Sequence, residues 1–140
     1  MYSLFPQSLR MRISKNYADL NEKQLGQILT VLTKFRNACA HGERLFTYRT
    51  RDGIPDLLIH KKLSIAKKGI QYIYGKNDLF SVVISLRYLL SAQQFKEFKQ
   101  ASNKLINNYI KRSSIQSADF LNEMGFPTNW SDITRYKKLS

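Results

Sequence analysis

The segment from Asn21 to Gly42 constrains the fold of this chain more than any other. Its apolar residues recur at steps of three and four positions, at Leu25, Ile28, Leu29, Leu32, Phe35 and Cys39. That spacing predicts one buried face of an amphipathic helix of about five turns. Asn21 and Gln24 have the spacing of a capping box, so the helix should begin there. Gly42 suits the left-handed position after a helix, which places His41 at the C-terminal end.

Other segments also have helical patterns, and strand alternation is weak throughout. A second helix is expected over about residues 78–90, and a third starts at Ser91, where Gln94 completes another capping spacing. Shorter helices are expected over about 9–17 and 117–124. The apolar face of the third helix comprises Phe95, Phe98, Leu105, Ile106, Tyr109 and Ile110.

Residues 43–77 are irregular, with turn signals at Asp52-Gly53, Pro55 and Gly75. A short helix or an extended piece is expected around Asp56–Ile65 within them. The pattern predicts an all-α protein: one helical bundle over residues 1–140, with a long connection after the helix that ends at His41.

Composition limits the classes of function. A chain of 140 residues with 43% hydrophobic residues supports one globular domain. No apolar run is long enough for a membrane span, and residues 1–10 lack the pattern of a signal peptide, so we expect a cytoplasmic protein. Cys39 is the single cysteine and there are two histidines, which argues against a disulfide or a zinc site. Acidic residues are scattered, so we expect no metal and no cofactor.

The net charge of +13 predicts an anionic partner, and nucleic acid is the first candidate. One basic region covers residues 34–68 and another covers residues 96–112. Candidate RNA-binding residues are Arg44, Arg49, Arg51, His60, Lys61, Lys62, Lys67 and Lys68. The plainer interpretation of this charge is a solvated basic surface.

Three side chains at the end of the long helix form a candidate catalytic group. His41 can exchange a proton near neutral pH, and Arg36 can hold a phosphate with its fork of donors. Asn37 lies four residues before His41 and shares its face, whereas Arg36 lies about 140° around the helix and must bend toward it. The alternative is structural: Arg36 pairs with Glu43 or a carbonyl group, and His41 stabilises the helix end.

The stretch Phe35-Arg36-Asn37-Ala38-Cys39-Ala40-His41-Gly42-Glu43-Arg44-Leu45-Phe46 resembles the signature of the Abi family, the Abi-like abortive-infection proteins of bacterial phage resistance. Further likenesses follow in order, at Ile54-Pro55-Asp56, His60-Lys61-Lys62-Leu63, Tyr88-Leu89-Leu90 and Met124-Gly125-Phe126-Pro127-x-x-Trp130. The resemblance spans about residues 2–131 and is to the C-terminal half of the family pattern. That core resembles the HEPN superfamily, whose ribonucleases carry an arginine and a histidine at this spacing.

The resemblance implies a metal-independent endoribonuclease of phage defence. His41 would act as general base or acid, Arg36 would stabilise the charged phosphorus centre, and Asn37 would orient His41 or a phosphate oxygen. One motif supplies one histidine, so a homodimer would join two motifs. The chain departs from the family in two ways: many relatives are longer, so we expect that an N-terminal half is missing, and many have a second histidine where this chain has Gly42.

Several residues keep more than one interpretation. His60 is a second acid, an RNA contact or a plain loop histidine, and Arg44 is a phosphate contact or a surface residue. Cys39 is expected on the buried face, which argues against a nucleophile. Tyr48, Tyr72 and Tyr74 either stack on unpaired bases or pack on the bundle, and Phe126 with Trp130 should anchor the C-terminal segment. The competing functions are a non-catalytic RNA-binding or protein-interaction module and a structural half of a longer protein.

Overall fold

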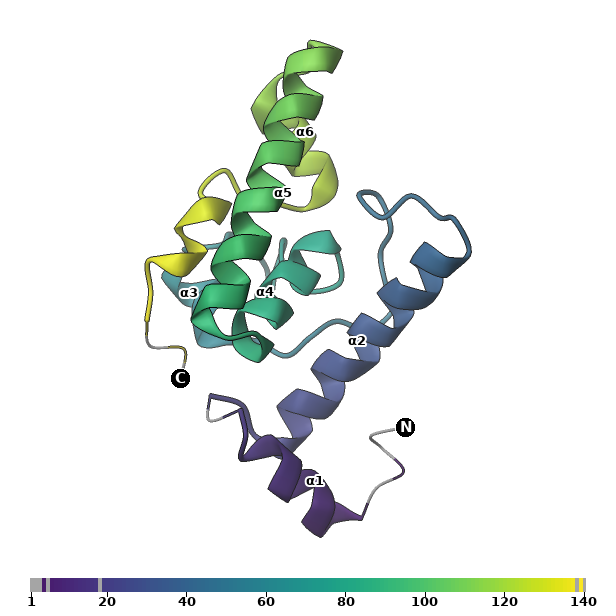
Figure 1. Cartoon of the computed structure of the whole chain (residues 1–140), viewed down its shortest axis with the longest axis vertical. Coiled ribbons are helices and arrows are strands. Elements are labelled where there is room, and N and C mark those ends of the chain that lie inside the picture. Colours follow the sequence, from purple (N-terminus) through teal and green to yellow (C-terminus); the bar gives the residue numbers. More distant parts are fainter. Residues whose placement is uncertain (1–3, 5, 18, 138, 140) are drawn as a thin grey trace.

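The computed structural model of the chain describes residues 4, 6–17, 19–137 and 139. Its helices are α1 (Gln7–Ser14), α2 (Glu22–Ala40), α3 (Leu58–Lys62), α4 (Leu79–Leu89), α5 (Ala92–Ser113), α6 (Ser117–Met124) and the 3-10 helix η2 (Trp130–Thr134). Two short strands, β1 (Lys67–Lys68) and β2 (Gln71–Tyr72), pair antiparallel. The predicted all-α class is confirmed (Figure 1).

Both ends of α2 lie where the sequence predicts them. Asn21 Oδ1 accepts a hydrogen bond from the Gln24 amide at 2.8 Å, and Gln24 Oε1 accepts one from the Asn21 amide at 3.0 Å. At the other end, Gly42 has a φ of +73°, a conformation that favours glycine. Its amide donates to the Cys39 carbonyl at 3.1 Å, and the next amide, of Glu43, donates to Ala38 at 3.0 Å. These two bonds form a Schellman motif, which fixes the helix end at His41.

The buried face of α2 differs by one position from the predicted face near its C-terminal end. Its buried residues are Leu25, Ile28, Val31, Phe35 and Ala38. Cys39 is exposed, so the expectation that it faces inward is wrong. Ala38 continues the three- and four-residue spacing from Val31 and Phe35, and Cys39 is turned about 100° away from it. Leu29 and Leu32 flank the buried stripe and are half-buried.

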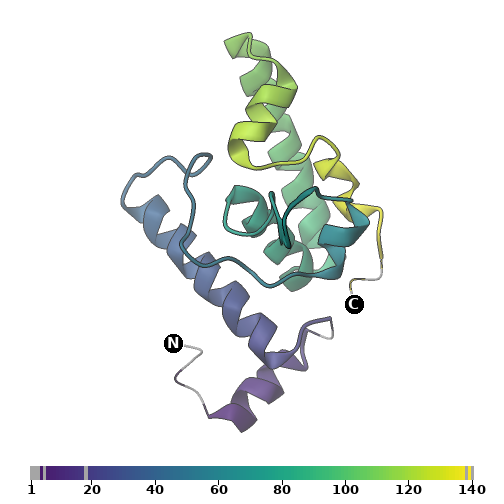
Figure 2. The same cartoon turned by 180° about the vertical axis from the view of Figure 1, so that it is seen from behind.

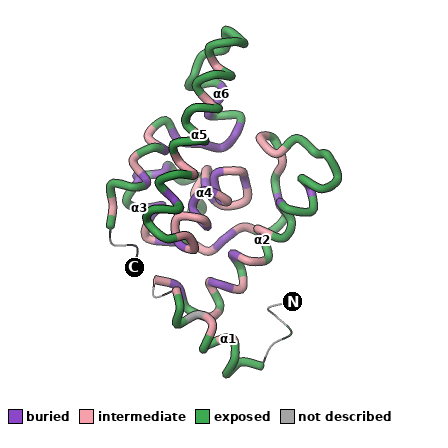
Figure 3. Tube along the Cα trace, in the orientation of Figure 1, coloured by how far each residue is buried: buried purple, intermediate pink, exposed green. Residues whose placement is uncertain are grey.

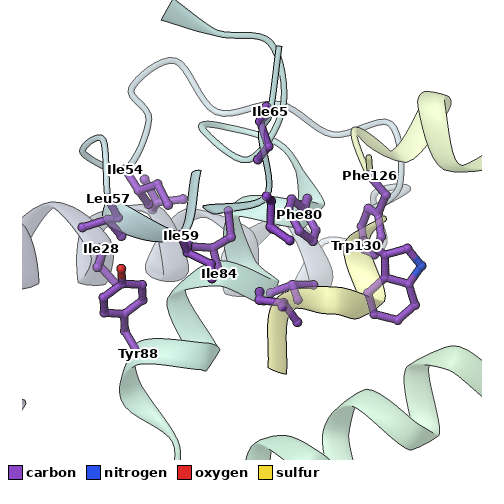
Figure 4. Packing of buried hydrophobic residues seen from close by; sticks show 14 of the residues in the cluster. Ile28, Ile54, Leu57, Ile59, Ile65, Phe80, Ile84, Tyr88, Phe126 and Trp130 are labelled. Carbon is purple, nitrogen blue, oxygen red and sulfur yellow. The ribbon is translucent and has the colours of Figure 1, made fainter. Parts of the chain in front are cut away.

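Helix α4 forms the centre of the hydrophobic core. It packs against α2, α5 and η2, and the buried residues of Figure 3 gather around it. Phe80 and Ile84 of α4 are fully buried, as is Ile28 of α2. Figure 4 shows these side chains meeting others from the connection and from the C-terminal segment. The apolar character of α4 on most of its surface therefore reflects its contacts on several sides.

Helix α5 extends beyond this core, with α6 folded back beside it (Figures 1 and 2). Phe95 near its start is buried, but Leu105 and Tyr109 in the projecting half are 71% and 46% exposed. The ring of Tyr109 stacks on Phe120 of α6 with centroids 4.6 Å apart. The predicted apolar face of α5 is therefore covered near the core and only partly covered where the helix projects.

Two buried polar side chains attach the irregular connection to the core. The Leu57 amide donates to His60 Nδ1 at 3.0 Å, so the other ring nitrogen, Nε2, carries the proton and donates to the Gly75 carbonyl at 2.7 Å. The Asp78 carboxylate accepts hydrogen bonds from the amides of Gly75 and Ser81 at 2.9–3.1 Å. Burial lowers the pKa of His60, against the opposing effect of its bond to Gly75. Burial raises the pKa of Asp78 to about 6, although these amides and Arg49 oppose the shift.

Hydrogen bonds from α4 hold the C-terminal segment against that helix. The Tyr88 hydroxyl donates to the Leu139 carbonyl at 2.7 Å, and Arg87 Nη2 donates to the Tyr136 carbonyl at 2.9 Å. Phe126 and Trp130 are both buried and meet edge to face, with ring centroids 5.4 Å apart. The prediction that these two aromatic residues anchor the segment is confirmed.

Gly125→Ala should destabilise the fold much more than Gly42→Ala. Both glycines have positive φ, so each alanine adds about 1–2 kcal/mol of backbone strain. A Cβ at Gly125 would also collide with the Asp78 carboxylate, whereas a Cβ at Gly42 meets no atom within 4 Å. Urea unfolding should therefore give a lower midpoint for Gly125→Ala than for the matched Gly42→Ala variant. Equal midpoints would contradict the packing described for Asp78.

Asp78→Asn should become more stable relative to the unaltered protein as pH rises. A carboxyl whose pKa is raised from 3.8 to about 6 in the fold stabilises it fully below about pH 3.8 and loses that contribution as pH rises through 6. Asparagine does not ionise, so the difference in unfolding free energy should change by up to about 3 kcal/mol between pH 4 and pH 7.5. Urea titrations of both proteins at the two pH values measure it. A pH-independent difference would rule out this linkage.

Candidate functional site

Arg36, Asn37 and His41 are exposed residues at the C-terminal end of α2, which Figure 1 shows at one side of the molecule. The His41 amide donates to the Asn37 carbonyl at 3.0 Å, so the helical hydrogen bonding continues through the cap. Asn37 and His41 therefore stand one turn apart on the same side of the helix. Arg36 leaves the helix about 140° away, and its long side chain must bend to reach them.

Neither the Arg36 guanidinium nor the His41 imidazole has an ion-pair or hydrogen-bond partner among the described residues. In that part of the chain, the ion pairs join Arg10 with Glu22 and Lys76 with Asp56. Glu43 is close in sequence but does not pair with Arg36 there. Two exposed polar side chains without such a partner in the described part of the chain are free to bind a ligand or another chain.

The segment that follows the motif is held by Arg49. Its Nη1 donates to the carbonyls of Phe46 and Tyr48 at 3.3 and 3.0 Å, and its Nη2 donates to the Glu123 carbonyl of α6 at 2.9 Å. The Tyr48 ring meets Phe35 of α2 edge to face at 5.0 Å. Arg49 therefore holds this segment in position, and because it is also exposed, its role as an RNA contact stays a prediction.

A pair of polar residues fixes the far end of the same segment. The Thr50 amide donates to the Asn77 carbonyl at 2.9 Å, and Asn77 Nδ2 returns a bond of 2.9 Å to the Thr50 carbonyl. With the Schellman motif at Gly42 on one side and this pair on the other, residues 43–50 have a defined path next to the motif.

His60 has no exposed atom to offer a substrate. It is 0% exposed, both ring nitrogens are hydrogen-bonded within the fold, and the Tyr72 ring stacks on it at 5.0 Å. The expectations of a second acid or an RNA contact at His60 are therefore replaced by a structural role. A histidine in a lysine-rich stretch is a poor guide to exposure, because α3 turns Lys61 and Lys62 outward and His60 inward.

Residues 1–47 match the family model described as Abi-like protein. This segment is similar to Abi-like proteins. It contains α1, α2 and the complete group of Arg36, Asn37 and His41. No curated protein and no solved structure matches the chain. The predicted resemblance is thus confirmed for this part of the chain. The further likenesses between Ile54 and Trp130 remain predictions.

The basic residues predicted to bind RNA do not form one surface with Arg36, Asn37 and His41. Arg44 follows the motif directly and is exposed. Lys61 and Lys62 lie on α3, across the molecule from the end of α2 (Figures 1 and 2). Lys67 and Lys68 are exposed on the hairpin strand β1, and Lys67 Nζ stands 4.6 Å from the centre of the Tyr72 ring.

Arg51 lies in a cleft of about 520 Å³ between the connection and the hairpin, with Tyr72 and Lys76 among its other lining residues. Asp52 and Asp56 also line this cleft, so its charge is mixed. Lys76 and Asp56 form an ion pair of 2.6 Å, which lowers the pKa of Asp56 through the hydrogen bond from the lysine. This cleft is a weaker anion site than the number of basic residues in the segment suggests.

The three tyrosines take the packing role. Tyr48 packs on Phe35, Tyr72 packs on His60, and the Tyr74 hydroxyl donates to Asn122 of α6. All three are only partly exposed, and the ring of Tyr72 is the one of the three that stacks face to face on another described ring. Among the residues that the structure describes, no three His, Cys, Asp or Glu side chains gather as a metal-binding group, and no helix is long and apolar enough to cross a membrane.

Arg49→Gln should loosen the segment beside the motif, because it removes the guanidinium that joins three carbonyls. Amide hydrogen exchange of residues 45–50 should accelerate by about tenfold or more, since each lost bond to a charged donor is worth about 1.5–3 kcal/mol. Arg51→Gln is the matched control, because it removes the same charge from an exposed residue two positions away. Equal exchange in both variants would show that Arg49 does not hold the segment.

Proposed function

We propose that this protein is a metal-independent endoribonuclease of abortive-infection phage defence. The observation that carries the proposal is the placement of Arg36, Asn37 and His41 at one exposed helix end inside the Abi-like segment. These side chains have no hydrogen-bond or ion-pair partner among the described residues, and their chemistry suits the cleavage of a phosphodiester. The net charge of +13 supports an RNA substrate.

The reaction would proceed by attack of the ribose 2′-oxygen on the adjacent phosphorus. His41 would remove the 2′-hydroxyl proton, or in the other role protonate the 5′-oxygen as its bond to phosphorus breaks. Arg36 would stabilise the charge that develops on the phosphoryl oxygens, and Asn37 would orient the imidazole or a phosphate oxygen. The products would be a 2′,3′-cyclic phosphate and a 5′-hydroxyl end.

Catalysis of this kind benefits from both a base and an acid, and one chain offers a single exposed imidazole. The sequence contains two histidines, and His60 is fully buried. We therefore infer that the active form is a homodimer in which the motif of each chain faces its twin. A two-fold contact around the end of α2 would place two copies of His41 in one composite site.

Substrate binding would extend from this site along exposed basic residues. Arg44 is the nearest in sequence, and Arg51 follows after the segment that Arg49 holds. Lys61, Lys62, Lys67 and Lys68 would contact RNA only if the strand continues across the molecule. They would otherwise serve as a solvated surface.

The second candidate function is a non-catalytic module that binds RNA or a protein partner. The observation that favours it is the openness of the motif: all three side chains are in solvent, and one chain supplies one imidazole. In that case binding should weaken with salt and should survive His41→Ala.

Wild-type protein should cleave a mixed RNA pool in the presence of EDTA, and His41→Ala or Arg36→Ala should slow cleavage by about 10²–10⁴-fold. Arg112→Ala is the matched control, because it removes an exposed arginine from the last turn of α5. Thermal unfolding of each variant should stay close to wild type, since neither motif side chain has a partner in the described part of the fold. Light scattering gives the molar mass in the same buffer. Intact RNA with a verified wild-type dimer, or full activity in His41→Ala, would refute the proposal.

A further inference from the structure

A basic cleft lies between the end of α4, the start of α5 and the 3-10 helix η2. Its volume is about 480 Å³, and its charged lining residues are Arg87, Lys96 and Lys99. The side-chain amides of Gln100 and Asn103 also line it, and no carboxylate is among the described lining residues. Figures 1 and 2 show η2, which contributes Thr134 to this lining, on the side of the molecule away from the C-terminal end of α2, so the cleft is separate from the group of Arg36, Asn37 and His41.

The Arg87 guanidinium is held in a fixed position at this cleft. Nε donates to the Ile133 carbonyl at 3.4 Å and Nη2 donates to the Tyr136 carbonyl at 2.9 Å. Its central carbon lies 5.8 Å from the centre of the Phe95 ring. The third nitrogen, Nη1, has no acceptor among the described residues. A guanidinium that is oriented by neutral groups keeps its full charge and loses little entropy when it binds an anion.

Lys99 is oriented in the same way, by a neutral partner. Its Nζ donates to the Thr134 hydroxyl at 2.6 Å, which fixes the ammonium group without neutralising it. The acidic neighbour in sequence, Glu97, accepts a hydrogen bond from Gln93 at 3.1 Å and does not line the cleft. Three positive charges therefore act together in one concave site, where the potentials of like charges add.

We propose that this cleft binds the phosphate of a nucleotide, either free or within an RNA strand. Arg87, Lys96 and Lys99 would hold the phosphate oxygens, and the amides of Gln100 and Asn103 would face the edge of the base. The volume lies within the range of small-molecule sites, about 300–1,000 Å³. The site needs neither the catalytic motif nor a dimer.

The test compares two double variants of α5 in a His41→Ala background, so that bound RNA is not cut. Lys96→Gln with Lys99→Gln removes two charges from the cleft, and Lys104→Gln with Lys111→Gln removes two exposed charges from the same helix outside it. Fluorescence anisotropy with a labelled oligouridine measures affinity across a salt series. For a bound strand, the cleft variant should lose about tenfold in affinity and reduce the slope of log K against log salt by about 1.4. The control should lose less than about threefold.

A second measurement separates the two sources of phosphate. Titration with adenosine 5′-monophosphate, followed by amide NMR signals of Ala92 and Thr134, detects a free nucleotide. Shifts that vanish in the cleft variant, without an effect on oligouridine binding, would identify a free nucleotide. An effect on oligouridine alone would identify the strand.

Equal losses of oligouridine affinity in both double variants, with no shift of Ala92 and Thr134, would overturn the proposal. Lys96→Gln alone guards against misfolding, because Lys96 is exposed and has no contact partner among the described residues. It should show about half of the change in salt slope. Failure of the ribonuclease proposal has a different signature, since RNA would then stay intact with His41 present while cleft binding persists.

Discussion

The rest of the structure depends on the hydrogen bonds that the buried Asp78 carboxylate accepts. It accepts hydrogen bonds from Gly75 at the end of the irregular connection and from Ser81 in the first turn of α4. Gly125, at the end of α6, lies so close that a side chain there would displace it. The end of the connection, the start of α4 and the distant end of α6 therefore meet at one buried carboxylate, and burial raises its pKa to about 6. His60 adds a second bond to Gly75 from α3.

The segment beside the candidate motif is linked to the Asp78 carboxylate indirectly. The path runs from Asp78 through Asn77 and Thr50 to the segment that Arg49 fixes between α2 and α6. The motif itself sits on α2, whose two caps set its length independently of the connection. Such a division is physically useful, because reactive side chains stand on a rigid helix while the neighbouring segment shapes their surroundings.

Local sequence signals were enough for the helix ends marked by a capping residue or a glycine, but they placed the first helix over 9–17 instead of Gln7–Ser14 and did not predict η2. The capping residues Asn21, Asp78 and Ser91 and the positive-φ glycines Gly42 and Gly125 lie at the helix ends that the sequence predicts. Side-chain environments were harder to predict from the sequence, since they depend on contacts between distant segments. The burial of His60, the carbonyl bonds of Arg49 and the basic cleft at Arg87 all arise from tertiary packing. An excess of basic residues over 96–112 was the one sequence signal for that cleft, and it did not show which of these residues line it.

The contrast between the two histidines gives the folded protein a useful spectroscopic property. His60 is buried in the core and His41 is exposed to solvent, so only the His41 imidazole can contact a dissolved molecule. In the histidine ring-proton spectrum, a ligand or second chain that touches the motif will perturb one set of signals directly. The other set will report on the integrity of the core. The His41 signals therefore report binding at the motif, and the His60 signals serve as an internal reference, without any added label.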